Sequence, residues 1–218
     1  MCEIRLLFPV HMRTFFQDDT WQSGLEEIRV RVGQPIEFCY GSDNCYLTGK
    51  EKEQMFCSEK DYRRWEKDLY HATEADLREM LNYISNYSLY AYKEEIKQGY
   101  ITIEGGHRVG VAGQTVLVDG KIAGISPITF LNIRIAHEKC GCARKILPLI
   151  RQRDSIYNTL ILSMPGAGKT TLLRDSIRAL SNGEAYGIRL KVCVVDERSE
   201  IAASFHGVPQ NDMGPRTD

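Results

Sequence analysis

Two short apolar runs lie on either side of an amphipathic stretch in the last third of the chain. The runs are residues 158–163 (NTLILS) and 190–197 (LKVCVVDE). The stretch between them, residues 168–181 (GKTTLLRDSIRALS), repeats its apolar residues at helical spacing and is followed by Gly183, a residue typical of helix ends. Apolar strands flanking a helix are typical of a parallel sheet buried on both faces. The sequence therefore predicts strand, loop, helix and strand over residues 158–197.

The loop before the predicted helix has a pattern that binds phosphate in many proteins. That pattern is G-x-x-x-x-G-K-[ST], and residues 163–170 (SMPGAGKT) match it except at Ser163, which is tolerated there if its φ is negative. Successive backbone N–H groups and the positive end of the helix dipole would bind phosphate oxygens. The Lys169 ammonium would reach the β- and γ-phosphates, and the Thr170 hydroxyl would ligate Mg²⁺. The residues expected to bind the nucleotide, ATP, are Pro165, Gly166, Ala167, Gly168, Lys169, Thr170 and Thr171.

The second apolar run ends in two acids, Asp196 and Glu197. In a Walker B strand the Asp binds Mg²⁺ through water, and a following Glu polarises the attacking water. Here, however, Asp196 follows Lys169 by only 27 residues (196 − 169). Either the chain has a compact, kinase-like arrangement, or the two acids form an additional site on the second strand. Glu197 is the candidate catalytic residue that would polarise the attacking water in both cases, and Asp196 is the candidate Mg²⁺ ligand.

The first 143 residues predict an α+β domain with an antiparallel sheet. Residues 25–40 read as strand, turn and strand, and residues 49–68 as a connection followed by an exposed helix face. Thr73 and Asp76 form a capping-box pattern at the start of a helix, and a second helix ends at Gly99. From Tyr100 the apolar residues alternate, which predicts three or four short strands with turns at residues 105–106 and 119–120. We therefore expect a two-domain α/β chain: an α+β domain at residues 1–143 and a partial P-loop NTPase domain at residues 144–218.

Composition and charge argue against several classes of protein. The formal net charge is −1, which gives no indication of a bulk nucleic-acid binder, and no nucleic-acid partner is expected. No apolar run approaches the length of a transmembrane helix, and the first residues make a poor signal peptide. The seven cysteines are irregularly spaced and do not pair as zinc ligands usually do. These features predict a cytoplasmic protein with reduced thiols.

Several segments together resemble the stage III sporulation protein AA family, which are sporulation ATPases of endospore-forming Firmicutes. The segments are LEEIRVRVGQPIEF, NYSLYAYKEEIKQGYITIEGGHRVGVAG, LNIRIAHEKCGCARKILP, PGAGKTTLLRD and VVDERSEIAASFHGVPQNDMGPRTD. This family is similar to the ATPases of type II and type IV secretion systems. The resemblance implies an ATP-hydrolysing motor that forms a homo-oligomer, a hexameric ring. It would work in the mother cell, held at the membrane by membrane-embedded sporulation channel proteins.

The resemblance also implies roles for particular residues. The C-terminal domain would be RecA-like, and VVDERSE would be the acidic motif that precedes a separate Walker B strand, which explains the short spacing after Lys169. Arginines of the N-terminal domain approach phosphates in the related ATPases. Arg108 and Arg134 are the candidates here for a catalytic role, and surface ion pairing is the alternative reading of both.

In the family that the chain resembles, a Walker B strand follows the segment that matches the final residues of this sequence. A sheet of only two parallel strands would also leave its edges and faces uncovered. The resemblance therefore implies a truncated chain that binds nucleotide weakly and hydrolyses it poorly. Two alternatives to a motor stay open. One is a P-loop small-molecule kinase, which fits the short spacing but not the long N-terminal domain. The other is a nucleotide-dependent assembly module that binds ATP with little turnover.

Overall fold

A computed structural model of the chain describes residues 4–16, 18–49, 55–152, 155–184, 187–197 and 199–218. The chain is mixed α/β and divides into two compact units, Met1–Ala136 and His137–Asp218. Part of the predicted connection, residues 50–54, lies outside the described residues.

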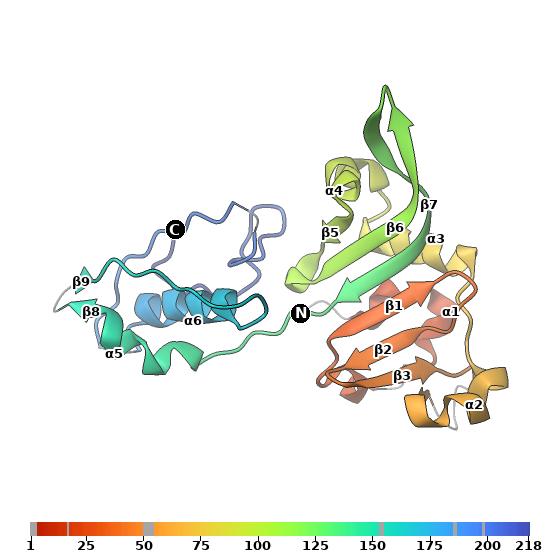
Figure 1. Cartoon of the computed structure of the whole chain (residues 1–218), viewed down its shortest axis with the longest axis horizontal. Coiled ribbons are helices and arrows are strands. Elements are labelled where there is room, and N and C mark those ends of the chain that lie inside the picture. The colour runs from red at the N-terminus through yellow and green to blue at the C-terminus, as the bar shows by residue number, and fades with distance from the viewer. Residues whose placement is uncertain (1–3, 17, 50–54, 153–154, 185–186, 198) are drawn as a thin grey trace. The chain divides into compact units, whose positions relative to one another are not determined.

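The first unit contains a seven-stranded sheet with the order β4-β3-β2-β1-β7-β6-β5 (Figure 1). All of its strand pairs are antiparallel, as the sequence predicts. The strands are β1 (Glu27–Arg31), β2 (Glu37–Tyr40), β3 (Asp43–Leu47), β4 (Phe56–Ser58), β5 (Tyr100–Thr102), β6 (Arg108–Val118) and β7 (Lys121–Arg134). The prediction that all strands after Tyr100 are short is wrong, because β6 has 11 residues and β7 has 14. The turn between them at Asp119 and Gly120 has φ values of 51° and 73°, which suit the tight turn of a long hairpin.

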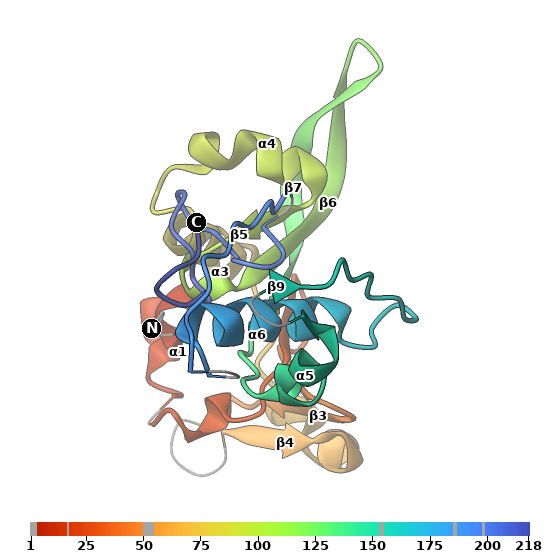
Figure 2. The ribbon, with the colours of Figure 1, turned by 90° about the vertical axis from the view of Figure 1, so that its left-hand side faces the viewer.

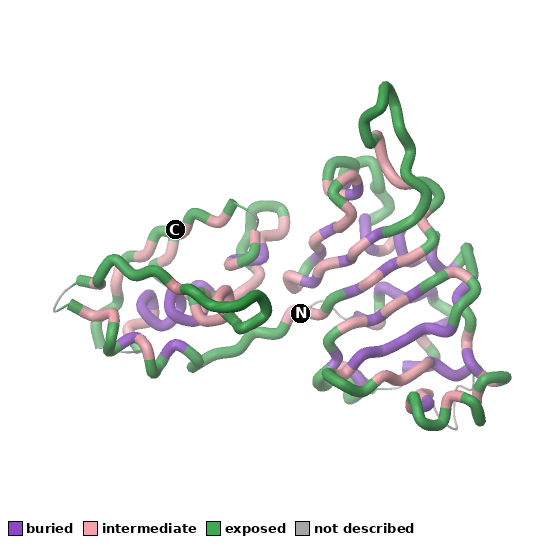
Figure 3. The backbone as a smooth tube through the Cα atoms, in the orientation of Figure 1, coloured by how far each residue is buried: buried purple, intermediate pink, exposed green. Residues whose placement is uncertain are grey.

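The core of this sheet lies where β1, β7 and β6 run side by side. Ile28 on β1 lies opposite Ile133 on β7, which in turn lies opposite Val109 on β6. All three side chains are fully buried, whereas the alternating residues between them on each strand are at least partly exposed (Figure 3). A period of two thus gives the sheet one apolar face and one polar face.

The described part of the first unit contains the α-helices α1 (Val10–Arg13), α2 (Tyr62–Trp65), α3 (Glu74–Ile84) and α4 (Lys93–Gln98). The predicted capping box of α3 is confirmed: the Asp76 N–H donates to Thr73 Oγ1 at 3.2 Å, and the Thr73 N–H donates to Asp76 Oδ2 at 2.8 Å. The apolar side of α3 is buried. The predicted end of α4 is also confirmed, since Gly99 follows it with a φ of 87° in the left-handed region.

The second unit contains α5 (Leu147–Ile150), the short pair β8 (Arg151–Gln152) and β9 (Ser155–Ile156), and α6 (Lys169–Asn182). The predicted helix is confirmed in α6, which ends at Gly183 with a φ of 76°. Ala179 and Leu180 pack with Ala143 and Leu147 in one apolar cluster, and Ile177 packs with Ala202 and Met213 in another. In the parts of the chain that the structure describes, no helix has the length and apolar character needed to cross a membrane.

The two strands predicted on either side of α6 are not formed, so that prediction is wrong. Residues 158–163 carry no strand, and Leu160 and Leu162 are 79% and 80% exposed. Residues 190–197 make only an isolated parallel bridge between Val192 and Thr217. In this bridge the Val192 N–H donates to the Arg216 carbonyl at 2.9 Å, and the Asp218 N–H donates to the Val192 carbonyl at 3.0 Å. A strand needs a neighbour for its backbone hydrogen bonds, and apolar residues alone do not supply one.

A buried ionic network joins α6 to the start of the second unit. The Asp175 side chain is 2% exposed and accepts hydrogen bonds from the Ala143 N–H at 2.7 Å and from Arg178 at 2.8 Å. Arg178 also pairs with Glu184. Burial acts to raise the pKa of the Asp175 carboxyl, but the hydrogen bonds from Ala143 and Arg178 outweigh it and hold the pKa below its ordinary value.

We predict that Thr73→Ala lowers the free energy of unfolding of the first unit by about 1 kcal/mol, because α3 loses its N-cap acceptor. Urea unfolding followed through the fluorescence of the buried Trp21 measures the change. Thr129→Ala, at an exposed position of β7, is the matched control and should leave stability nearly unchanged. Equal midpoints for the Thr73 variant and the wild type would contradict the role of the cap.

We predict that acid weakens the second unit through Asp175. Because the folded pKa is depressed, the stabilisation is present above the unfolded pKa of about 4 and is lost as pH falls through the lower folded pKa. Hydrogen exchange of the α6 amides should be faster in Asp175→Asn than in the wild type near neutral pH. The difference between the two proteins should shrink below about pH 4. A difference independent of pH would show that the charge is not the stabilising feature.

Candidate functional site

The loop at residues 163–170 leads directly into the first turn of α6. Gly166 and Gly168 have φ values of 77° and 85°, so both adopt the left-handed conformation that glycine reaches without strain. A Cβ at either position would meet nothing within 4 Å, so backbone conformation rather than crowding favours glycine there. Ser163 is not among the described residues with a positive φ, in agreement with the condition set for serine at this position.

The Lys169 side chain folds back across this loop. Its Nζ donates to the Ser163 carbonyl at 3.1 Å and to the Met164 carbonyl at 3.0 Å, and it lies 3.4 Å from Ser163 Oγ. The ammonium is therefore held over the loop by neutral acceptors. A phosphate oxygen would add a charge–charge attraction that a neutral carbonyl does not provide, so an anion in the loop would compete well for this ammonium.

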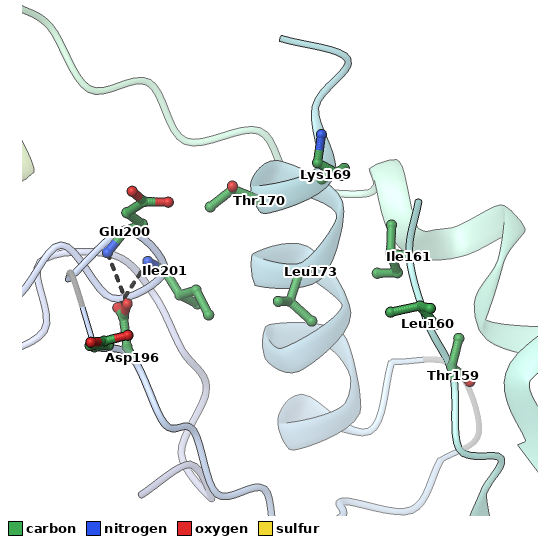
Figure 4. A pocket seen from close by; sticks show the side chains of 10 residues that line it. Thr159, Leu160, Ile161, Lys169, Thr170, Leu173, Asp196, Glu200 and Ile201 are labelled. Atoms are coloured by element: carbon green, nitrogen blue, oxygen red, sulfur yellow. Dashed lines mark hydrogen bonds between the residues drawn. The ribbon is translucent and has the colours of Figure 1, made fainter. Parts of the chain in front are cut away.

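A cavity of about 470 Å³ lies beside the first turn of α6 (Figure 4). Three segments line it: residues 159–161, the start of α6, and residues 196–197 with 200–201. Thr170 extends from α6 toward the segment that carries Asp196 and Glu200 (Figure 4). Glu197 also lines this cavity and is exposed. The structure therefore brings the predicted residues Lys169, Thr170, Asp196 and Glu197 to the lining of one cavity.

The Asp196 carboxylate also stabilises the backbone that follows it, a role that the sequence did not predict. Its carboxylate accepts hydrogen bonds from the backbone N–H groups of Glu200, Ile201 and Ala202, each at 2.9 Å. Three donors on one carboxylate fix the turn that follows it. In the sequence, the only indication of this turn is that Asp196 precedes the small residues Ala202 and Ala203 in DERSEIAA.

Arg174 is a second residue of the site that the sequence analysis did not single out. From the middle of α6 its guanidinium donates to the Ile201 carbonyl at 2.7 Å and to the Glu200 carbonyl at 2.8 Å. Burial lowers the pKa of the Arg174 guanidinium, and the negative charges of Glu138 and Asp196 oppose that change. Asp196 and Arg174 together hold residues 200–201 through both their N–H groups and their carbonyls, which fixes one wall of the cavity.

Arg108 and Arg134, the candidates from the N-terminal part, lie in the first unit. They are directly opposite each other on β6 and β7. The Arg134 Nε lies 3.3 Å from a carboxylate oxygen of Glu27, and the Arg108 guanidinium lies 5.1 Å from the centre of the Tyr100 ring. Surface pairing thus accounts for the position of Arg134, and a catalytic role for either arginine stays a prediction.

Fold and site together describe a mixed α/β protein with a glycine-containing loop at the start of a buried helix. The family model for "Sporulation stage III, protein AA" matches residues 2–218, and the chain belongs to this family. The stage III sporulation protein AA of Bacillus subtilis (strain 168) is 39% identical over 220 residues, which cover 100% of this chain. The chain spans 64% of the length of that curated relative. No solved structure was found to match the chain.

We predict that Asp196→Asn loosens the turn after the cavity wall, because an amide offers one acceptor where the carboxylate offers two. Hydrogen exchange of the Glu200, Ile201 and Ala202 amides should accelerate about tenfold or more, as expected when a charged hydrogen bond worth about 1.5–3 kcal/mol is lost. Glu197→Gln is the matched control, since Glu197 is exposed and adjacent. Unchanged exchange in Asp196→Asn would contradict the anchoring role.

Proposed function

We propose that this chain binds ATP at residues 163–171 and is part of an ATP-hydrolysing motor of endospore formation. The observation that carries the proposal is the loop itself: two left-handed glycines lead into α6, and a lysine ammonium is held over them by two carbonyls and the Ser163 hydroxyl. Backbone N–H groups at a helix N-terminus, with a lysine nearby, form the usual setting for a triphosphate.

Each residue would have a separate role in binding the nucleotide and its magnesium ion. Lys169 would exchange its two carbonyl acceptors for β- and γ-phosphate oxygens, and the backbone from Pro165 to Thr171 would surround the phosphates. Magnesium usually binds through one or two protein oxygens together with substrate phosphates. The Thr170 hydroxyl and the Asp196 carboxylate at the cavity fit that limited donor set, and Mg²⁺ would neutralise charge on the phosphates.

Glu197 is the residue proposed to polarise the attacking water, since it lines the cavity and is exposed. A carboxylate in reach of solvent can accept a proton from water in a triphosphate hydrolase. Arg108 and Arg134 are proposed to stabilise phosphate charge from the first unit. The proposed domain is RecA-like, which is the fold that the resemblance to secretion ATPases implies.

The cellular role follows from the family. Membership in the sporulation stage III protein AA family supports a role in sporulation. We further propose a homo-oligomeric ring, most simply a hexamer, that works in the cytoplasm of the mother cell. It would energise a secretion-like channel and would be held at the membrane by the proteins of that channel.

A nucleotide-dependent assembly module is the second candidate function. The Asp196 oxygens already accept three backbone hydrogen bonds, which limits how freely they can serve a metal. Among the described residues, none forms a strand beside residues 158–163 that would hold the loop in place. Both observations favour a chain that binds nucleotide but turns it over slowly.

We predict that Lys169→Ala weakens ATP binding at least about thirtyfold, because one charge-assisted contact of about 2 kcal/mol or more is lost. Isothermal titration with Mg-ATP measures the affinity, and Lys191→Ala, an exposed lysine of the same unit, is the matched control. Equal affinities in wild type and Lys169→Ala would refute the proposed site. Phosphate release then separates the two candidates: binding without release favours the assembly module, and release that Glu197→Gln abolishes favours the hydrolase.

A further inference from the structure

The hairpin of β6 and β7 extends beyond the rest of the sheet (Figures 1 and 2). We call residues 112–128 the arm. β5 pairs with β6 only as far as Gly110, and β1 pairs with β7 only from Phe130 onward. Within the described strands, the arm is therefore a two-stranded ribbon whose outer edges are both unpaired. A ribbon of this kind is marginally stable in water by itself.

The outer part of the arm is apolar as well as unpaired. Leu117 and Ile122 lie opposite each other and are 61% and 55% exposed, and Val116 and Val118 are exposed on the same ribbon (Figure 3). Exposed apolar side chains on a free strand edge are a common mark of a surface that pairs with another chain.

The two edges of the arm differ in their ability to pair. β7 carries Pro127, which has no N–H to donate, and its pairing with β6 shifts register on either side of that residue. A Cβ on Gly113 would lie 2.0 Å from the Pro127 carbonyl oxygen, so the ribbon is closely fitted at this point. By contrast, residues 112–118 of β6 (AGQTVLV) contain neither proline nor charge. The β6 edge is thus the one suited to strand addition.

We propose that the β6 edge of the arm pairs antiparallel with the same edge of a second copy of this chain. Centred on Thr115, such a pairing places Leu117 opposite Gly113 of the second copy, and Val118 opposite Ala112. Leu117 and Val118 thus face small residues, Val116 faces Gln114, and Thr115 faces itself, a favourable cross-strand pair. The nearest charges, Asp119 and Lys121, lie outside the paired segment, so no like charges meet.

A second copy of the chain can satisfy the backbone hydrogen-bonding groups of the arm, which a lipid surface cannot do. Strand pairing gives hydrogen-bond partners to the N–H and C=O groups along the β6 edge, whereas lipid leaves those groups unsatisfied. The contact is two-fold and closes after two copies, so it differs from the head-to-tail contacts of a ring. It also requires no nucleotide, and its test is therefore independent of the proposed ATP site.

A charge exchange at the two-fold axis tests the proposal. Thr115→Lys and Thr115→Glu each place like charges opposite one another, so each should raise the dimer dissociation constant about tenfold or more. An equal mixture of the two variants should recover wild-type association, because opposite charges then meet. Sedimentation velocity without nucleotide measures all three, and Thr129→Lys, at an exposed position of β7 outside the arm, is the matched control.

Three outcomes would overturn the proposal: a wild type that stays monomeric, single variants that associate like the wild type, or a mixture that fails to recover. Wild-type protein that stays monomeric but sediments with phosphatidylglycerol vesicles would show that the arm binds lipid instead. A cysteine test covers the case in which the charged variants misfold. With the exposed Cys140, Cys142 and Cys193 replaced by serine, Thr115→Cys should form a disulfide-linked dimer under mild oxidation, and Thr129→Cys should not.

Discussion

The first unit depends on the register in which β1, β7 and β6 pair. Because side chains alternate along a strand, a shift of one residue would move Ile28, Ile133 and Val109 from the core to solvent. The same register also determines the polar face: it places Arg134 between Glu27 on one side and Arg108 on the other. Burial on one face of the sheet therefore fixes the arrangement of charges on the opposite face.

Sequence signals that act within one helical turn correctly predicted where helices begin and end. The capping pair at Thr73 and the glycines after α4 and α6 act through backbone geometry within one turn, so the sequence alone located those helices. Residues 158–163 and 190–197 were predicted as strands from their apolar character. A strand also needs a neighbour, and among the described residues only 216–218 supply one, to the second run. Composition cannot reveal whether that neighbour exists.

The candidate site likewise has some features that the sequence predicted and others that it did not. The loop glycines and Lys169 form a contiguous pattern, and the sequence predicted them together with the acids that line the cavity. The bonds from Asp196 and Arg174 to residues 200–202 were not predictable, because they depend on the path of the chain between α6 and the following segment. Those two charged side chains shape the cavity, whereas the loop supplies the groups suited to bind phosphate.

The hydrogen bond between Ala143 and Asp175 has a mechanical consequence. Ala143 lies seven residues after the end of the first unit at Ala136 (143 − 136), and seven residues span at most about 25 Å. α6 begins at the loop and carries Asp175 in its second turn. A displacement of α6 that preserves this hydrogen bond must therefore carry the Ala143 backbone with it, so the Asp175 carboxylate couples the helix mechanically to the first residues of the second unit.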